Sequence, residues 1–491
     1  MIGIILGTAA ALVCSCIFLH ISWKLYTSKL SFLPSPPSIP FVGHVLLLEH
    51  EPYKLFYQFQ NFFNTYGDTF VIWIGYVPLI FSSNIDYVAE ILSSKDMIKK
   101  STLYWSLCEW LGTGLLTSYG SKWIKRRRLI TPTFHFNILN DFMSIFMEHS
   151  KGLVESFKLE CDTGQAIDVQ VPISLAALDV ICETAMGVKI NSQQCTTSQY
   201  AKSVHSMNSH LQLRQRSPWL WPDFIYKQTS SGKSYYKDLN VLHDFTIDII
   251  NKRIKSRKIL KESTSDQSNP RKKVFLDMLL DLYDEGEIDI DGIREEVDTF
   301  MFEGHDTISA GLSWILYLLG RHPEIQRKLH SEIDKVDASE NLEKKILELK
   351  YLEGVIKEGL RLHPPVALFA RMLEEDTVIN NNVFPKRTEL GVAVMALHHN
   401  ENYWDEPEEF IPDRFLDDDI LKRHPYCFVP FSAGYRNCIG QKFAMREEKI
   451  LLFHVMSKFR LESIQEEDDV QHCFEIIHRS GNGLMIKFFS R

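Results

Sequence analysis

Hydrophobic residues follow two patterns along the chain, one continuous run and several periodic stretches. The continuous run, Ile2 to Trp23, has no Asp, Glu, Lys or Arg. At about 1.5 Å per helical residue it is long enough to cross a bilayer. Tyr53 to Tyr66 and Leu139 to Leu159 have helical periodicity, whereas Phe70 to Phe81 and Val378 to Val394 carry strand and turn signals. The chain is therefore predicted to be mainly α with minor β, preceded by an N-terminal transmembrane helix.

The residues after the apolar run predict its orientation. Lys24 and Lys29 follow it directly, and this positive flank favours retention of the downstream chain in the cytosol. The run is thus interpreted as an uncleaved signal anchor, and the alternative is a cleaved signal peptide. Leu33 to Pro40 is rich in proline and predicts a stiff extended spacer. Ser256 to Lys273 is polar and predicts an exposed loop.

Composition narrows the class of protein. The chain has 491 residues, of which 45% are hydrophobic, so it can bury a large core. Its net charge is -9 and it has no long Lys/Arg block, which argues against a nucleic-acid partner. The nine cysteines contain no Cys-x-x-Cys pair and are interpreted as reduced thiols in a cytosol-facing protein.

The most specific motif is the segment from Phe431 to Gly440, Phe-Ser-Ala-Gly-Tyr-Arg-Asn-Cys-Ile-Gly. Its cysteine, Cys438, lies in a short loop before an apolar helix, where backbone N–H groups stabilise a thiolate. A thiolate is a soft, electron-donating ligand for iron. From these residues alone, a buried structural cysteine remains the alternative.

This segment resembles the heme-binding loop of the cytochromes P450, Phe-x-x-Gly-x-Arg-x-Cys-x-Gly, at every defined position. The resemblance implies that Cys438 is the proximal ligand of a heme b iron and that Arg436 contacts a heme propionate. It also implies that Phe431 packs against the ligand loop. Gly434 and Gly440 are expected to let the backbone approach the porphyrin closely.

Further landmarks follow in the order typical of this family. Glu358 and Arg361, at i and i+3, can form a buried ion pair, and the resemblance adds Arg414 as the third member of a structural triad. Trp123 and Arg127, at i and i+4, face one way.

The resemblance also assigns heme-propionate contacts to three residues. These are Trp123, Arg127 and Arg371.

A helix predicted from about Asp291 to Leu319, ended by Gly320 and Pro323, carries polar residues inside an apolar sequence. Burying them is costly, so they indicate function. Gly304 is expected to leave room for a flat group, and Thr307 to bond its own backbone.

This helix resembles the oxygen-binding groove of the family. There Asp306 and Thr307 would be the catalytic residues, as a relay that delivers protons to dioxygen. His305 is interpreted as a packing histidine. With Thr131 to Phe136, Glu303 makes the chain resemble family 4, the fatty-acid ω-hydroxylases. In that group the matching glutamate is ester-linked to the heme, and a free buried carboxylate is the alternative.

The resemblance implies a cytochrome P450 fold in three parts: 1–23 as a transmembrane signal anchor, 24–40 as a proline-rich hinge and 41–491 as a heme-thiolate catalytic domain. The chain has no Rossmann or flavin motif, so electrons from NADPH are expected through a separate NADPH-cytochrome P450 reductase. Cytochrome b5 is a further expected partner. The expected location is the endoplasmic reticulum membrane, single-pass, with the catalytic domain on the cytosolic side.

The expected reaction is hydroxylation of a small lipophilic substrate, a fatty acid or related lipid, at or near its chain end. Hormones or xenobiotics are the alternative substrates. A heme-thiolate isomerase or dehydratase and a non-catalytic heme carrier or gas sensor are rival functions that need no proton relay. Substrate choice is expected from Ser101–Leu116, Ser203–Phe224 and Ser480–Met485. A set of basic residues is a candidate reductase-docking surface or simply a solvated face: Lys422, Arg423, Lys442, Arg446 and Lys449.

Overall fold

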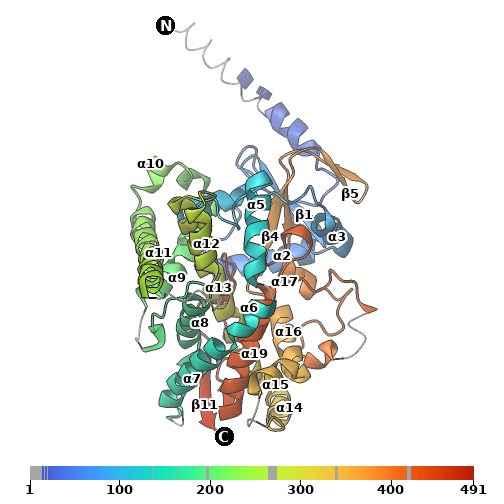
Figure 1. Cartoon of the computed structure of the whole chain (residues 1–491). Helices are drawn as coiled ribbons and strands as arrows, with labels where there is room; N and C mark the ends of the chain where they lie inside the picture. Colours follow the sequence, from blue (N-terminus) through green and yellow to red (C-terminus); the bar gives the residue numbers. More distant parts are fainter. Residues whose placement is uncertain are drawn as a thin grey trace.

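The computed structural model describes residues 14, 15, 17, 18, 20–134, 136–161, 163–194, 198–263, 274–337, 341–416 and 422–491. Most of the predicted membrane segment, Ile2 to Trp23, lies outside these residues. Residues 20–28 are helical and project from the body of the molecule (Figure 1). Among the described residues, no helix combines the length and the apolar character needed to cross a membrane.

Helices form most of the body, as predicted. The N-terminal half contains α2 (Pro52–Tyr66), α3 (Ile85–Ser93), α4 (Cys108–Leu111), α5 (Gly120–Ile130), α6 (Phe136–Asp141), α7 (Met143–Glu160), α8 (Gln170–Thr184), α9 (Gln199–Arg216) and α10 (Asp223–Tyr226). The C-terminal half contains α11 (Ser230–Ser263), α12 (Phe275–Asp284), α13 (Ile290–Arg321), α14 (Pro323–Ile333), α15 (Leu342–Glu348), α16 (Lys350–Leu362), α17 (Val394–His398) and α19 (Gln441–Lys458).

Helix α13 runs through the middle of the body (Figure 1) and packs against α8, α11, α16 and α19. Its N-terminus is capped by the side chain of Asp289, which accepts a hydrogen bond from the backbone N–H of Gly292 at 2.7 Å. The helix continues through Gly320 to Arg321, two residues beyond the predicted end. A side chain on Gly320 would lie 2.7 Å from the backbone nitrogen of Ser463, so glycine is needed there for close packing.

Four small sheets lie beside the helices. The largest has the order β1 (Thr69–Ile74), β2 (Val77–Ser82), β7 (Glu389–Val392), β4 (Phe369–Met372), in which only the β2–β7 pair is parallel. The others are β3 (Ile167–Asp168), β11 (Met485–Ser490) and β8 (Phe459–Ser463); β9 (His472–Cys473) with β10 (Arg479–Ser480); and β5 (Thr377–Ile379) with β6 (Asn382–Phe384). The mainly helical fold with minor sheet is confirmed.

Three local predictions change. The helical stretch from Leu139 to Leu159 is divided at Phe142 into α6 and α7. The loop predicted from Ser256 is helical as far as Ser263, where α11 ends, and its remainder lies outside the described residues. The proline-rich segment is extended, as predicted, but it lies against the body, because the N–H of Val71 donates to the carbonyl of Pro34 at 2.9 Å.

Candidate cofactor site

Cys438 lies in the loop between a short 3₁₀ turn, Gly434–Arg436, and the first residue of α19. Its backbone N–H donates to the carbonyl of Phe431 at 2.9 Å, which closes the loop. Burial raises the pKa of the Cys438 thiol to about 11, and the backbone N–H groups of Gly440 and Gln441 oppose this rise. The loop therefore already directs donors at the sulfur, as predicted for a thiolate site.

Cys438 nevertheless keeps exposed surface. Burial raises the pKa of this sulfur, yet its surface is accessible, so the sulfur faces a space inside the protein. Helix α13 likewise has a few accessible residues among buried ones. Every residue from Glu296 to Leu319 is buried except Glu303, Gly304 and Thr307. Glu303 and Thr307, at i and i+4, share one face. The sulfur and this face are the two open surfaces expected on either side of a flat cofactor.

Positive charge is concentrated beside this space. Burial and the neighbouring Arg371 and Arg436 lower the pKa of Lys100 well below its usual value. Burial also lowers the pKa of Arg436 to about 9, again with Arg371 beside it. Glu303 is the carboxylate that acts on Lys100 and Arg436, and burial raises its pKa. An excess of buried positive charge fits a ligand with two carboxylates, such as the propionates of heme.

Arg436 is fixed by backbone carbonyls rather than by carboxylates. Its guanidinium lies over the ring of Trp123, 4.8 Å from the ring centroid. It donates at 2.7–3.3 Å to the carbonyl oxygens of Ile98, Leu115, Leu116 and Ser118. Trp123 and Arg436, predicted on different segments, therefore form one unit beside the cysteine loop.

Arg127 has a different partner from the one predicted. Its two terminal nitrogens donate to the backbone and side-chain oxygens of Asn437 at 2.8 and 2.7 Å. Arg127 thus holds the residue before Cys438 in place. The predicted contact with a heme propionate would have to use the same guanidinium N–H donors. Arg371, on β4, pairs through its backbone with Lys100 and donates to the Ala370 carbonyl at 3.2 Å.

Two glycine predictions are corrected. Gly434 has φ +69°, and a side chain there would overlap the carbonyl oxygen of Leu92, so glycine is required for contact with protein, not with a porphyrin. At Gly304 a side chain would lie 2.6 Å from Cδ1 of Ile181, so glycine allows α13 to pack against α8. At Gly440 an added side chain would meet only the Cys438 sulfur, at 3.8 Å, which leaves that side of the loop open as predicted.

The polar residues of α13 are held by specific partners. Oδ2 of Asp306 accepts from Arg479 at 2.6 Å and from Asn208 at 2.9 Å. The hydroxyl of Thr307 donates to the Glu303 carbonyl at 2.6 Å, which confirms its predicted bond to its own backbone. His305 is bonded through Nε2 to Ser174 at 2.7 Å, and burial lowers its pKa to about 4, as expected for a neutral packing histidine.

The predicted structural triad is confirmed. Nε and Nη2 of Arg361 each donate to the Glu358 carboxylate at 2.8 Å, and Nε of Arg414 donates to it at 3.2 Å. Glu358 and Arg361 are fully buried. Arg361 also donates to the carbonyls of His398, Pro407 and Glu409, so it joins α16 to the segment that leads towards the cysteine loop.

Four residues of the site were not singled out from the sequence: Lys100, Tyr104, Asn208 and Arg479. Tyr104 and Asn208 lie within the predicted substrate segments Ser101–Leu116 and Ser203–Phe224, but only the fold brings the four residues to Glu303 and Asp306. The predicted substrate segments do meet, because Gln215 donates to the Leu103 carbonyl at 3.1 Å. Helix α9 also meets residues just before the predicted Ser480–Met485, since Gln212 bonds to the carbonyl of Phe474 and Ser209 to Glu475.

The predicted basic surface is partly buried. Arg446 and Lys449 are 8% and 4% exposed, and Lys449 is bonded to the carboxylate of Glu353 at 2.7 Å. Arg423 is paired with Asp405 at 3.3 Å. Of the five basic residues, only Lys422 and Lys442 are exposed.

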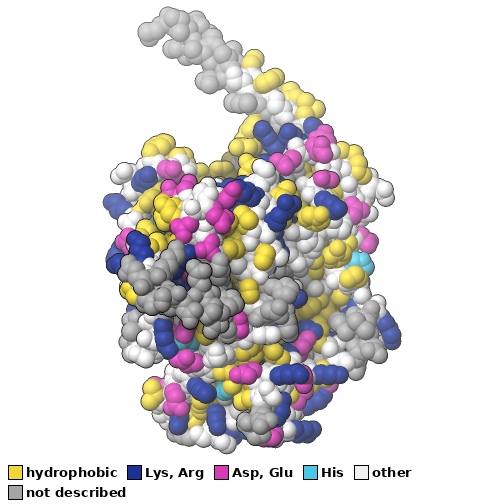
Figure 2. Space-filling model, viewed as in Figure 1, with side chains coloured by type: hydrophobic (Ala, Val, Ile, Leu, Met, Phe, Trp, Pro, Cys, Tyr) yellow, Lys and Arg dark blue, Asp and Glu magenta, His cyan; other side chains and the backbone are white. Residues whose placement is uncertain are grey.

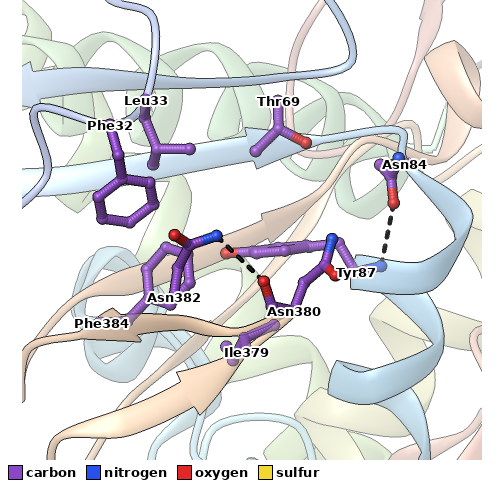
Figure 3. Close-up of a pocket in the computed structure, with 9 residues that line it drawn as sticks. All are labelled: Phe32, Leu33, Thr69, Asn84, Tyr87, Ile379, Asn380, Asn382 and Phe384. Carbon is purple, nitrogen blue, oxygen red and sulfur yellow. Dashed lines mark hydrogen bonds between the residues drawn. The ribbon is translucent and has the colours of Figure 1, made fainter.

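A separate pocket is lined by residues of β1, β5 and β6, of the start of α3 and of the chain after the N-terminal helix (Figure 3). Its walls include Phe32, Thr69, Tyr87 and Phe384, and a hydrogen bond from Asn382 to the Asn380 carbonyl, 3.1 Å long, crosses its edge. It contains none of the predicted site residues, so it is distinct from the space beside Cys438.

Comparison with known proteins agrees with this geometry. A family model described as cytochrome P450 matches residues 33–483. Cytochrome P450 4V2 of Mus musculus is 42% identical over 483 residues, which cover 95% of this chain and 92% of that protein. Cytochrome P450 4c3 of Drosophila melanogaster is 38% identical over 478 residues, covering 94% of this chain and 89% of that protein. The chain therefore belongs to family 4 of the cytochromes P450, heme-thiolate monooxygenases.

Proposed function

We propose that this monooxygenase holds its heme through Cys438 and hydroxylates fatty acids or related lipids at or near the chain end, with electrons from NADPH through a separate reductase. The observation that carries the proposal is the pair of open surfaces, the Cys438 sulfur and the face of α13 that carries Glu303 and Thr307, on an otherwise buried framework. When bound, the heme supplies the activation of dioxygen for insertion into a C–H bond.

The residues around Cys438, called the cysteine side, hold the thiolate ligand in place and stabilise its negative charge. Gly440 and Gln441 direct N–H groups at the sulfur, and Arg127 adds positive charge, so the thiolate is stabilised before any metal arrives. Lys100, Arg371 and Arg436 would hold the two propionates, which explains why three cations are buried beside one carboxylate. Trp123 supports this arrangement by packing under Arg436.

Asp306 and Thr307, with the residues that hold them, form the α13 side of the site and would transfer protons. Asp306 is held between Arg479 and Asn208, and Thr307 is its neighbour on the open face of the helix. We infer that Asp306 takes up protons that solvent supplies, while Arg479 stays protonated and holds the carboxylate in place, and that the Thr307 hydroxyl passes the protons on when it leaves the Glu303 carbonyl. Because this region is buried and excludes other water, protons are kept on the route through Asp306 and Thr307.

Glu303 is positioned to bond covalently to the cofactor. It lies four residues before Thr307 on the same open face, and among the described residues its carboxylate has no hydrogen-bond or ion-pair partner within bonding distance. Burial raises its pKa, and Lys100, Arg436 and Arg127 oppose this rise. An ester from the Glu303 carboxylate to a heme methyl would exchange a C–H bond for a C–O bond, a two-electron oxidation for which the dioxygen and NADPH of the proposed reaction would supply the oxidant. The ester would fix the cofactor and favour attack at the end of a chain.

A membrane location is supported by the surface. Ile17, Phe18, Ile21 and Leu25 on the N-terminal helix are at least half exposed, and Figure 2 shows hydrophobic side chains along the described part of this projection. Helix α10, with Phe224 74% exposed, lies at the same end of the molecule (Figure 1). We infer that this end faces the endoplasmic reticulum membrane, with the catalytic body in the cytosol.

The test is a product profile. The full chain is reconstituted with a cytochrome P450 reductase, NADPH and a panel of medium-chain and long-chain fatty acids, with and without cytochrome b5, and products are identified by mass spectrometry. Hydroxylation at the chain end supports the proposal. Oxidation of hydrocarbons, hormones or xenobiotics without fatty-acid products would overturn the substrate class while leaving the monooxygenase assignment intact.

A further inference from the structure

Three histidines meet in the interior, away from the cysteine loop. His363 follows α16, His472 lies in β9, and His478 immediately precedes β10. Their side chains are 6%, 6% and 1% exposed. One ring nitrogen of each lies within 4.8 Å of a ring nitrogen of the other two. Imidazoles brought together from segments more than 100 residues apart are a recurring feature of metal sites.

Aromatic rings hold the three imidazoles in place. The ring of Trp314, on α13, stacks on His363, His472 and His478 with centroid distances of 4.3, 4.9 and 5.0 Å. Phe56, on α2, stacks on His472 at 5.0 Å and on His478 at 5.6 Å. The site is thus preorganised, because the orientation of each ring is set by packing rather than by the ligand.

Protein groups meet only part of the hydrogen-bonding capacity of these rings. His472 lies between two partners, with Nε2 3.1 Å from Oε1 of Glu467 and Nδ1 3.2 Å from Nε2 of His478. Among the described residues, Nδ1 of His363 and Nδ1 of His478 are buried and have no partner. Buried ring nitrogens without partners are costly, and a bound cation is one way to satisfy such lone pairs.

The distances suit a metal of zinc size. Zinc–nitrogen bonds of about 2.0–2.1 Å place two tetrahedral ligands about 3.3 Å apart. The His472 and His478 nitrogens are already 3.2 Å apart. Nε2 of His472 faces the Glu467 carboxylate, which orients the ring, and its Nδ1 faces Nε2 of His478, so an ion bound between the last two nitrogens would replace their hydrogen bond.

We propose that His363, His472 and His478 form a structural site for a divalent transition-metal ion of the zinc class. Imidazole ligands favour such borderline ions over magnesium or calcium. The ion would fasten the β9–β10 hairpin to the end of α16. It would also steady Arg479, which follows His478 directly and holds Asp306 at 2.6 Å.

The first experiment measures metal content. The full-length protein is treated with a chelator, dialysed against zinc and analysed for zinc and iron by atomic emission, with heme iron counting the folded chains. We expect about one zinc per chain more in the wild type than in the double variant His472→Gln/His478→Gln. His330→Gln, a half-buried histidine of α14, is the matched control for side-chain loss, and His424→Gln controls for surface binding.

The second experiment examines the zinc site directly and then its effect on stability. X-ray absorption at the zinc edge of the wild type should show nitrogen ligands at about 2.0–2.1 Å with imidazole scattering. Zinc should also raise the melting temperature of the wild type and the two controls but not of the double variant. Equal zinc content in the wild type and the double variant, or a zinc edge typical of surface carboxylates and water, would overturn the proposal.

Discussion

The cysteine side and the α13 side of the site are built in different ways. On the cysteine side, charged side chains bind mostly backbone carbonyls: Arg436 contacts four of them, Arg127 binds that of Asn437, and Arg361 binds three in addition to the Glu358 carboxylate. On the α13 side, Asp306 depends on two side chains, Arg479 and Asn208. A backbone carbonyl is present whatever residue occupies the position, whereas a side-chain partner can be replaced. We infer that the cysteine side secures the cofactor and that the α13 side is the adjustable part.

The strongest test of this contrast is Cys438→Ser. A hydroxyl does not ionise as a thiol does, so the soft ligand is lost, and we expect heme content to fall sharply and turnover to disappear. Heme absorbance and product formation measure the result. Cys161→Ser is the control, because its sulfur lies 3.3 Å from Oγ of Ser490, where a hydroxyl makes the same contact. Retained turnover in Cys438→Ser would refute its role as ligand.

Arg361→Ala tests the framework on the cysteine side. It leaves the Glu358 carboxylate buried and removes bonds to three carbonyls, so the free energy of unfolding should fall by about 3–5 kcal/mol. Urea unfolding followed by circular dichroism measures the loss. Arg327→Ala, an exposed residue of α14, should change little. Equal stability of the two variants would show that the triad does not support the loop.

Asp306→Asn tests the α13 side and should separate turnover from cofactor binding. The amide can still bond to Arg479 but cannot carry a proton, so product formation should drop about 100-fold while heme content stays normal. Product per NADPH consumed is the readout, and the exposed Asp291→Asn is the control. Loss of heme in Asp306→Asn would contradict the proposed division of roles.

Acid should lower the free energy of unfolding, because each side of the site contains a buried histidine that is protonated more easily in the unfolded chain. Burial lowers the pKa of His398 to about 3 and of His305 to about 4, below the usual value of about 6.5. The unfolded chain therefore binds protons first, and stability falls as pH drops below about 6.5, by up to about 1.4 kcal/mol per pH unit for each histidine. His398 accepts from the N–H of Val429 at 2.9 Å. His398→Gln should make urea unfolding less dependent on pH, and an unchanged slope would contradict this.

The smallest effect on turnover is expected for Glu303→Gln. Its carboxylate touches the cofactor face but is not part of the proposed proton route, so activity should fall only severalfold. The variant should, however, release all of its heme to acidified organic solvent, whereas part of the wild-type heme should stay attached. Complete extraction from the wild type would show that the heme is not ester-linked.

Sequence reasoning identified the residues whose roles are encoded in local spacing. The Cys438 loop, the Glu358–Arg361 pair and the polar face of α13 are close in sequence, so periodicity and motif were sufficient to find them. The corrections arose where a role depends on a distant neighbour. Gly304 faces Ile181, Gly434 faces Leu92, and Lys449 is buried against Glu353. None of these contacts leaves a local signature.

The sequence by itself therefore determined the fold class, the cysteine ligand loop and the helix opposite it, because hydrophobic periodicity and short motifs act within one element. Only the tertiary structure decided which charges meet. Lys100 and Arg371 come together through strand pairing, Arg479 reaches Asp306 from the C-terminal hairpin, and three histidines converge under Trp314. Such contacts depend on how elements pack across hundreds of residues, and electrostatic energies depend on distance in space rather than along the chain.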